Sequence, residues 1–257
     1  MGATRDSCRG ASGAGGIASL ILCLFAPVAS AQSAEPNTEI FTGVEASDNY
    51  ASVYVGGGTA LGKGLYEPGF RLRAVASFGR YHYDGTLFTD GDYVPTTFDG
   101  EDAFLAALAG YQFRKGPFIA KLFAGIEAED QHISPHDPNN SVQGSEIGLW
   151  LATETWLDVS PKLFVSADAS YGTAFQEYYS LARVGFRVRP HFALGLEGGA
   201  LGNEEYNAGK GGGFVRLNLR DTEFTLSGGF TGNYLLDDPS SYVALGVYRT
   251  FQPDSLR

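Results

Sequence analysis

Charged side chains recur at every second residue in several segments, and these are the residues that could do chemistry. Arg71 and Arg73 flank one apolar residue, and Arg183 and Arg187 share one phase of a later segment. With period two, each set lies on one face of a β-strand. The residues that we expect on a common inner face are Trp150, Trp156, Glu154, Asp168, Arg71, Arg73, Lys121, Arg183, Arg187, Glu197 and Arg216.

Two kinds of role suit such a set. Side chains of both charges can neutralise one another and fill a polar interior, or they can line a selective conduit. Trp150 and Trp156, together with Tyr54, could offer aromatic faces to the apolar faces of sugar rings. Alternatively, these aromatic residues fill space or form a girdle at a membrane interface.

Catalytic constellations are weak. His132 and Ser134 form the motif His-Ile-Ser in a loop that also holds His136 and Asp137, superficially like a lipid esterase. A hydrolase needs a nucleophile, a base and an orienting acid on a rigid scaffold, which a Pro-rich loop does not supply. The same residues could coordinate a metal, but loop histidines at this spacing are usually solvated. We therefore predict no catalytic residues, no metal and no cofactor.

The segment from Glu146 to Tyr171 shows which elements position the charged set. Its residues alternate with period two, pause at the turn signal of residues 159–162, and then resume the alternation. The uncharged phase is long enough to cross a bilayer, since a tilted membrane strand needs about 9 to 11 residues. This segment predicts a long β-hairpin.

The same pattern predicts twelve strands in an all-β chain. We expect them at residues 39–47, 51–61, 70–83, 102–113, 118–129, 145–158, 163–172, 179–189, 192–202, 212–220, 224–234 and 242–251. From the third strand onward, tight links alternate with longer loops, the longest at 84–101 and 130–144. Short turns at one end and longer loops at the other are typical of an up-and-down antiparallel transmembrane β-barrel, with both termini at the short-turn, periplasmic end.

One phase of these strands is free of charge. Phe118, Leu122 and Ile126 share a phase that opposes Lys121 and Glu127, for example. A lipid-facing Arg or Lys at the midplane costs about 2 to 4 kcal/mol, so hydrocarbon demands this exclusion. A soluble β-sandwich would alternate too, and it is the alternative fold.

The N-terminus has the features of a secretory signal peptide over residues 1–31. Arg5 and Arg9 precede an apolar run, and residues 29–31 read Ala-Ser-Ala, a cleavage signature. Cleavage there removes both cysteines, Cys8 and Cys23. It also changes the net charge from −11 to −12, because Arg5, Asp6 and Arg9 leave with the peptide. Residues 32–257 then form a single domain, and its acidity argues against nucleic acid as a partner.

Glycine-rich stretches at residues 56–58 and 211–213 do not predict nucleotide binding. Phosphate-binding glycine loops open a helix, and neither stretch is followed by one. In strands, such glycines permit bends or a close approach of backbone segments.

Several short motifs, in order, resemble the bacterial cellulose biosynthesis protein BcsS family. They lie at residues 69–85, 137–140, 144–148, 170–178, 182–185, 202–204 and 209–214. The similarity spans about residues 42–232. Residues 195–197 read Gly-Leu-Glu where the family pattern suggests a proline, which puts one local bend in doubt. Six residues also follow Phe251, whereas such barrels usually end on their last aromatic residue.

The resemblance implies an outer-membrane role in making, exporting or anchoring cellulose. Its implied partners are outer-membrane lipid, cellulose and other cellulose-secretion components, and nucleotide is not among them. We expect a non-enzymatic barrel that serves export or anchoring of the glucan. A general porin for small solutes is the first alternative, and a lipid-modifying esterase is the second.

Overall fold

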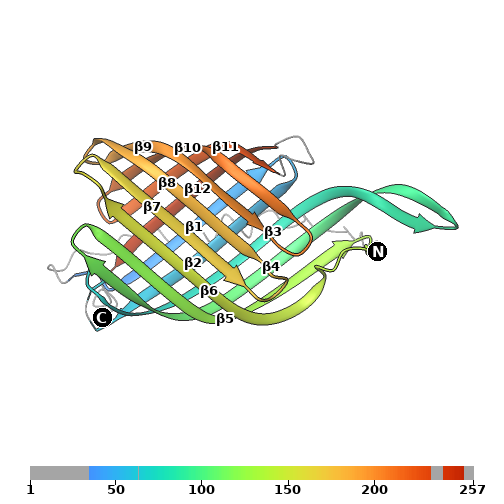
Figure 1. Cartoon of the computed structure of the whole chain (residues 1–257), viewed down its shortest axis with the longest axis horizontal. Coiled ribbons are helices and arrows are strands. Elements are labelled where there is room, and N and C mark those ends of the chain that lie inside the picture. The colour runs from blue at the N-terminus through green and yellow to red at the C-terminus, as the bar shows by residue number, and fades with distance from the viewer. Residues whose placement is uncertain (1–34, 63, 233–239, 252–257) are drawn as a thin grey trace, which may run out of the picture. The chain divides into compact units, whose positions relative to one another are not determined.

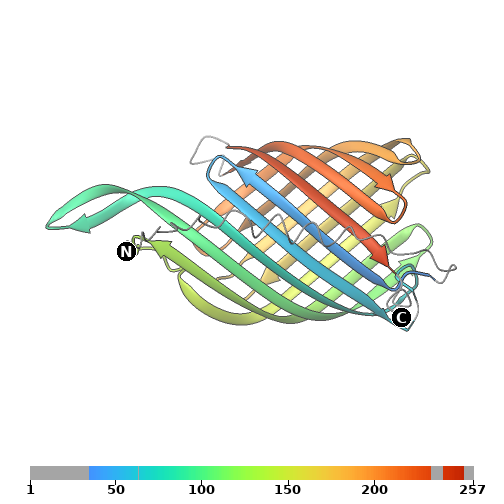
Figure 2. The same ribbon diagram turned by 180° about the vertical axis from the view of Figure 1, so that it is seen from behind.

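The computed structural model describes residues 35–62, 64–232 and 240–251. These residues form twelve antiparallel strands, each hydrogen-bonded to its neighbours in the chain, and β1 pairs with β12 to close the barrel (Figures 1 and 2). The expected signal peptide lies outside the described residues. No helix within the described ranges is long and apolar enough to span a membrane.

The strands confirm the predicted number and order. They are β1 (Thr38–Ser47), β2 (Tyr50–Leu61), β3 (Gly69–Thr89), β4 (Asp92–Lys115), β5 (Phe118–Ser134), β6 (Gly144–Asp158), β7 (Leu163–Gly172), β8 (Tyr178–Arg189), β9 (Phe192–Gly202), β10 (Asn207–Leu219), β11 (Thr222–Gly232) and β12 (Ser240–Phe251). A closed ring removes the open edges that a sheet in hydrocarbon could not tolerate. The β-sandwich alternative is therefore wrong.

The two ends of the barrel differ. We call the end that holds the start of β1 and the end of β12 the turn end, because tight links such as Gly116-Pro117 and Arg220-Asp221 join strands there. The opposite end, the loop end, carries the connections 135–143, 173–177 and 203–206.

Our prediction of a loop at residues 84–101 is wrong. β3 and β4 continue through this region as a two-stranded ribbon that projects beyond the other strands (Figure 1). The ribbon closes at Asp90-Gly91, both with positive φ, which fits the right-handed twist of the strands. β5 likewise extends to Ser134, and β10 begins at Asn207 inside another expected loop.

The outer face carries an apolar band with charged borders. Leu149 is 63% exposed and Leu122 53% exposed. On β3 this band starts near Phe70 and ends before Arg80, which pairs with Glu101 at 2.9 Å. Exposed aliphatic and aromatic side chains on every strand are what a lipid-facing surface requires.

Candidate functional site: the barrel interior

Cross-strand register defines which side chains face the interior. Arg73 on β3 pairs in register with Gly58 and Leu108, and this phase continues from strand to strand around the ring. Arg73 forms an ion pair with Glu154 on β6, three strands away, which only an inward-pointing side chain can reach. The inward phase contains all eleven residues singled out above: Trp150, Trp156, Glu154, Asp168, Arg71, Arg73, Lys121, Arg183, Arg187, Glu197 and Arg216.

Near the turn end, four charged side chains form a network across the interior, which we call the transverse network. Arg73 contacts Glu39 at 3.0 Å and also pairs with Glu154. Lys121 lies 3.0 Å from Glu154 and 3.6 Å from Glu39. The hydroxyl of Tyr248 donates to Glu39 at 2.9 Å. Strands β1, β3, β5, β6 and β12 are thus bridged at one level of the barrel.

The described part of the β2–β3 connection also packs against the interior near the turn end. The inward-facing guanidinium of Arg71 donates to the backbone carbonyls of Gly64, Leu65 and Glu67, the last at 2.6 Å. The side-chain amide of Gln112 donates to the Leu65 carbonyl at 2.9 Å. Arg71 and Gln112 are almost fully buried, as is Leu65. Two interior side chains therefore hold this turn against the inner wall.

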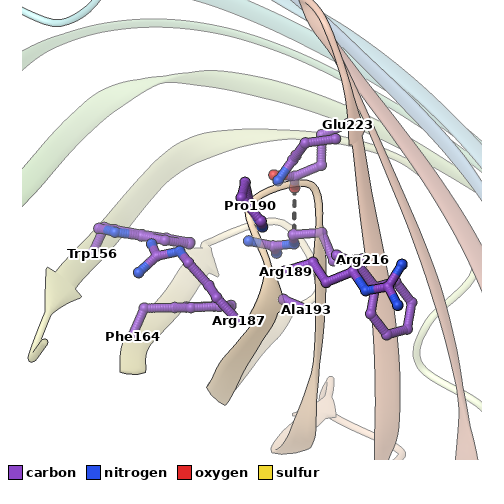
Figure 3. A pocket seen from close by; sticks show the side chains of 10 residues that line it. Trp156, Phe164, Arg187, Arg189, Pro190, Ala193, Arg216 and Glu223 are labelled. Carbon is purple, nitrogen blue, oxygen red and sulfur yellow. Dashed lines mark ion pairs between the residues drawn. The ribbon is translucent and has the colours of Figure 1, made fainter. Parts of the chain in front are cut away.

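A second cluster at the turn end combines aromatic and arginine side chains (Figure 3). Trp156 stacks on Phe164 with ring centroids 4.5 Å apart and planes 11° from parallel. The Arg187 guanidinium lies 4.9 Å from the Phe164 ring, and Arg216 lies 5.4 Å from Trp156 and pairs with Glu223 at 3.0 Å. These residues line a cavity of about 90 Å³, enough for a few water molecules. Trp156 is thus packed within this cluster.

Trp150 is also engaged by its neighbours. Its ring meets that of Phe104 edge to face at 4.8 Å. Both rings pack against the buried cluster of Ala106, Leu108 and Phe123. Of the three aromatic residues proposed as stacking platforms, only Tyr54 retains a substantially open surface, with 38% of the residue exposed.

A third group of polar contacts lies on β8 to β12 and β1. Glu197 accepts from Arg183 at 2.8 Å, from Tyr242 at 2.6 Å and from Ser227 at 3.0 Å. Lys210 pairs with Glu45 at 2.5 Å. Both carboxylate oxygens of Glu197 therefore have hydrogen-bond donors, although the proline suggested by the family pattern is missing beside it.

Open interior surface remains between these clusters. Tyr54 on β2 and Tyr179 on β8 are 38% and 37% exposed, and both are on the inward phase. Their strands are six positions apart in a ring of twelve, so the two rings lie on opposite walls. Asp168, also inward and partly buried, makes no hydrogen bond or ion pair with any residue that the structure describes.

The β7–β8 loop, residues 173–177, folds over the inner wall at the loop end. Glu127 accepts from the backbone N–H of Ala174 at 2.9 Å, and Glu146 accepts from that of Phe175 at 3.2 Å. Phe175 has a φ of 47° and is buried with Ala174. Gly148 permits this approach, because a Cβ there would lie 2.6 Å from the Ala174 nitrogen.

The same loop brings carboxylates together. Glu177 follows the buried turn, near Glu129 and Glu127 of β5 and Asp102 of β4. Desolvation and, after it, the negative charge of these neighbours raise the pKa of Glu177 from its ordinary value of 4.5 to about 8. This end of the interior is acidic, whereas Arg71, Arg73, Lys121, Arg187 and Arg216 gather near the turn end.

The possible catalytic residues do not form a constellation. Asp137 accepts from the Tyr83 hydroxyl at 2.8 Å and from the Asn139 N–H at 3.0 Å. His136 shares a hydrogen bond with Gln143 at 2.8 Å. Within the described residues Ser134 has no hydrogen bond to a histidine, and no group of three His, Cys, Asp or Glu residues is arranged to hold a metal ion.

Sequence reasoning missed three members of the interior. Glu39 is the second residue of β1, and it forms ion pairs with both Arg73 and Lys121. Lys210 lies in a segment expected to be a loop, and Tyr242 is an inward residue of β12 whose hydroxyl donates to Glu197. Their position on the inward phase of period two is a signal that could have found all three.

Comparison with known proteins decides the family. The sequence model described as cellulose biosynthesis protein BcsS matches residues 40–251. The chain belongs to this family. A search of curated proteins found no match.

Solved structures share the fold at low sequence identity. The translocator domain of the autotransporter NalP from Neisseria meningitidis has a TM-score of 0.50 at 12% identity, covering 84% of this chain and 89% of that one. An outer-membrane channel from Pseudomonas putida F1 also has a TM-score of 0.50, at 13% identity, covering 86% of this chain and 97% of that one. These BcsS-family residues therefore form a barrel of the outer-membrane type.

Proposed function

We propose that this BcsS-family barrel is a non-enzymatic outer-membrane component that anchors cellulose at the cell surface. The observation that carries the proposal is the asymmetry of the interior. The transverse network and the buried β2–β3 turn occupy the turn end, whereas Tyr54 and Tyr179 expose aromatic surface further in, with the unpaired carboxylate of Asp168 on the same inward phase. Such an interior suits a cup that holds a glucan segment better than a conduit that passes one.

The chemistry of the open surface fits a neutral sugar chain. Tyrosine rings on opposite walls can stack on the apolar faces of sugar rings, and their hydroxyls can bond sugar hydroxyls. The Asp168 carboxylate, which has no protein donor, can accept from such hydroxyls. Membership of a cellulose biosynthesis family makes a β-glucan the natural ligand.

The orientation proposed here places the turn end and both termini in the periplasm. Outer-membrane barrels usually carry short turns on the periplasmic side and longer connections outside. In this orientation the cup opens to the exterior. The protein then contacts cellulose after synthesis and export, together with other components of cellulose secretion.

Binding of cellohexaose to the purified barrel in lipid nanodiscs tests the cup. The double variant Tyr54→Ala/Tyr179→Ala should bind cellohexaose about tenfold or more weakly, because both stacking faces are lost. Leu149→Phe, a change on the lipid face, is the matched control and should bind like the wild type. Equal affinity of the wild type and the double variant would refute the cup.

A deletion strain tests the cellular role. Glucan polymerisation by inner-membrane vesicles should remain intact, while cellulose retained at the cell surface should fall. Loss of polymerisation would show that the protein acts on the synthase instead. Planar-bilayer conductance separates the porin alternative, since a closed turn end should give little current.

A further inference from the structure

The β3–β4 ribbon carries exposed aromatic side chains far from the apolar band. We define the ribbon as residues 83–98, because β2 ends its pairing with β3 at Tyr81 and β5 first pairs with β4 at Asp99. The seven residues from 83 to 89 extend about 24 Å beyond the barrel wall at about 3.4 Å each. The ion pair of Arg80 and Glu101 lies at its base, on the border of the apolar band.

Phe88 and Tyr93 stand opposite each other near the tip of this ribbon. They are 60% and 75% exposed, and their ring centroids lie 5.2 Å apart at an angle of 57°. Thr86, Pro95 and Thr97 continue the same face of the ribbon. At this distance from the band the two rings cannot serve as a lipid-interface girdle, so their exposure calls for another partner.

The base of the ribbon is fixed by packing on the face opposite the pair. On the opposite face, Tyr83 stacks on Phe98 at 5.1 Å, and Phe98 is fully buried. The Tyr83 hydroxyl bonds Asp137 and receives a hydrogen bond from Asn140, both in the β5–β6 loop. A loop packed against one face leaves Phe88 and Tyr93 pointing to the other side.

The charges and edges of the ribbon narrow the choice of partner. It carries Asp84, Asp90 and Asp92 and no Lys or Arg, so it repels anionic lipid headgroups. Its free edges include these carboxylates and Pro95, features that oppose the addition of another β-strand, from a second copy or from another protein. A neutral polyhydroxylated chain meets neither obstacle.

We propose that the β3–β4 ribbon is a second glucan-binding surface, in which Phe88 and Tyr93 stack on the sugar rings of assembled cellulose. Thr86, Thr97 and the ribbon carboxylates offer hydrogen-bonding groups to the glucan hydroxyls beside the rings. This inference rests on the proposed function for the identity of the ligand. It adds a site outside the barrel, suited to an insoluble surface that cannot enter the cup.

Retention on insoluble amorphous cellulose tests the ribbon with the full barrel in nanodiscs. Phe88→Ala/Tyr93→Ala should weaken retention about tenfold or more, because the two stacking faces are lost. Tyr66→Ala is the matched control, since Tyr66 is also exposed but lies in the β2–β3 turn at the opposite end. It should bind like the wild type. Heat-dependent gel mobility would verify that both variants are folded.

The outcomes separate the ribbon from the cup. Weakened retention with unchanged cellohexaose binding supports a ribbon site independent of Tyr54 and Tyr179. Wild-type retention by Phe88→Ala/Tyr93→Ala overturns the ribbon and leaves the cup standing. Self-association of the wild type that this variant abolishes, measured by sedimentation, would also overturn the proposal, because the pair would then bind a second copy.

Discussion

Replacing Arg73 by alanine should destabilise the barrel and open its turn end. Arg73 bridges Glu39 and Glu154, and only 8% of the Arg73 side chain and 4% of that of Glu39 are exposed. Its removal leaves two carboxylates to share Lys121 in a poorly solvated site. Breaking a buried ion pair by removing one partner typically costs about 3 to 5 kcal/mol, and we expect a loss of that order.

Arg80→Ala provides the matched control for the loss of an arginine. Arg80 pairs with Glu101 at 2.9 Å on the outer surface, where its side chain is 70% exposed. Surface pairs of this kind contribute about 0 to 1 kcal/mol. The double variant Arg73→Ala/Glu154→Ala should recover part of the loss, because it removes one of the two uncompensated carboxylates.

Urea unfolding in lipid vesicles, followed by tryptophan fluorescence, measures these free energies. Trp150 and Trp156 are the two tryptophans of the chain and both lie on β6, so the signal reports on the barrel wall. Planar-bilayer conductance of the same samples reports whether the turn end opens. The role proposed for the transverse network is refuted if Arg73→Ala and Arg80→Ala lower the free energy of unfolding by the same small amount. It is also refuted if the wild type conducts as well as Arg73→Ala, because the transverse network would then not close the turn end.

Three further predictions concern the outer face, the β7–β8 loop and the N-terminus. Leu149→Arg should lower the free energy of unfolding by about 2 to 4 kcal/mol, whereas Leu149→Phe should be tolerated, because Leu149 faces lipid. Equal free energies of unfolding for the two variants in urea would contradict the assignment of Leu149 to the outer face. The pKa of Glu177 is raised from 4.5 to about 8, so docking of the loop should be strongest below pH 4.5 and should weaken as the pH rises through 8. Hydrogen exchange at Ala174, corrected for its intrinsic pH dependence, should therefore be faster at pH 9 than at pH 5, and Glu177→Gln should reduce this difference; a pH-independent rate would oppose it. Mass spectrometry of the mature protein should place its first residue at Gln32, and retention of Cys23 would show that cleavage occurs elsewhere.

Period two was sufficient to predict the barrel. Once Leu149 is assigned to lipid and Trp150 to the interior, each neighbouring strand inherits its phase through cross-strand register, and the register shifts at the end of β8, between Arg187 and Arg189. Hydrocarbon enforces this pattern, because a charge on the outer phase is costly. The inward set could therefore be predicted from alternation and charge alone.

Contacts across the interior could not be predicted in the same way. Arg73 and Glu154 are 81 residues apart, and their meeting depends on strand tilt and on the curvature of the closed ring. Alternation gives the face of a side chain but not the level at which it meets the opposite wall. For the same reason, the sequence could not distinguish the packed rings of Trp150 and Trp156 from the open rings of Tyr54 and Tyr179.

The ribbon was missed because its sequence resembles a loop. Residues 84–101 contain four Asp, three Gly and one Pro, which favour turns and irregular structure. Only the strand-forming pairs of Leu87 with Val94 and Phe88 with Tyr93 indicate strands, and the Asp90-Gly91 turn between them is a hairpin signal. Pairing confined to two strands leaves most of the ribbon exposed beyond Phe98, so alternation of apolar and polar residues is weak there.

The distribution of side chains along the barrel supports the proposed retention of glucan over its passage. A conduit needs an open path at both ends, yet the ion pairs of Arg73 and Lys121 link β3 to β6 and β5 to β1 across the interior near the turn end. Aromatic surface is instead exposed inside the barrel at Tyr54 and Tyr179 and outside it at Phe88 and Tyr93. If the turn end faces the periplasm as proposed, both surfaces meet cellulose only after export. If the transverse network also closes that end, as proposed, any link to the synthesis machinery must run through the turns and termini.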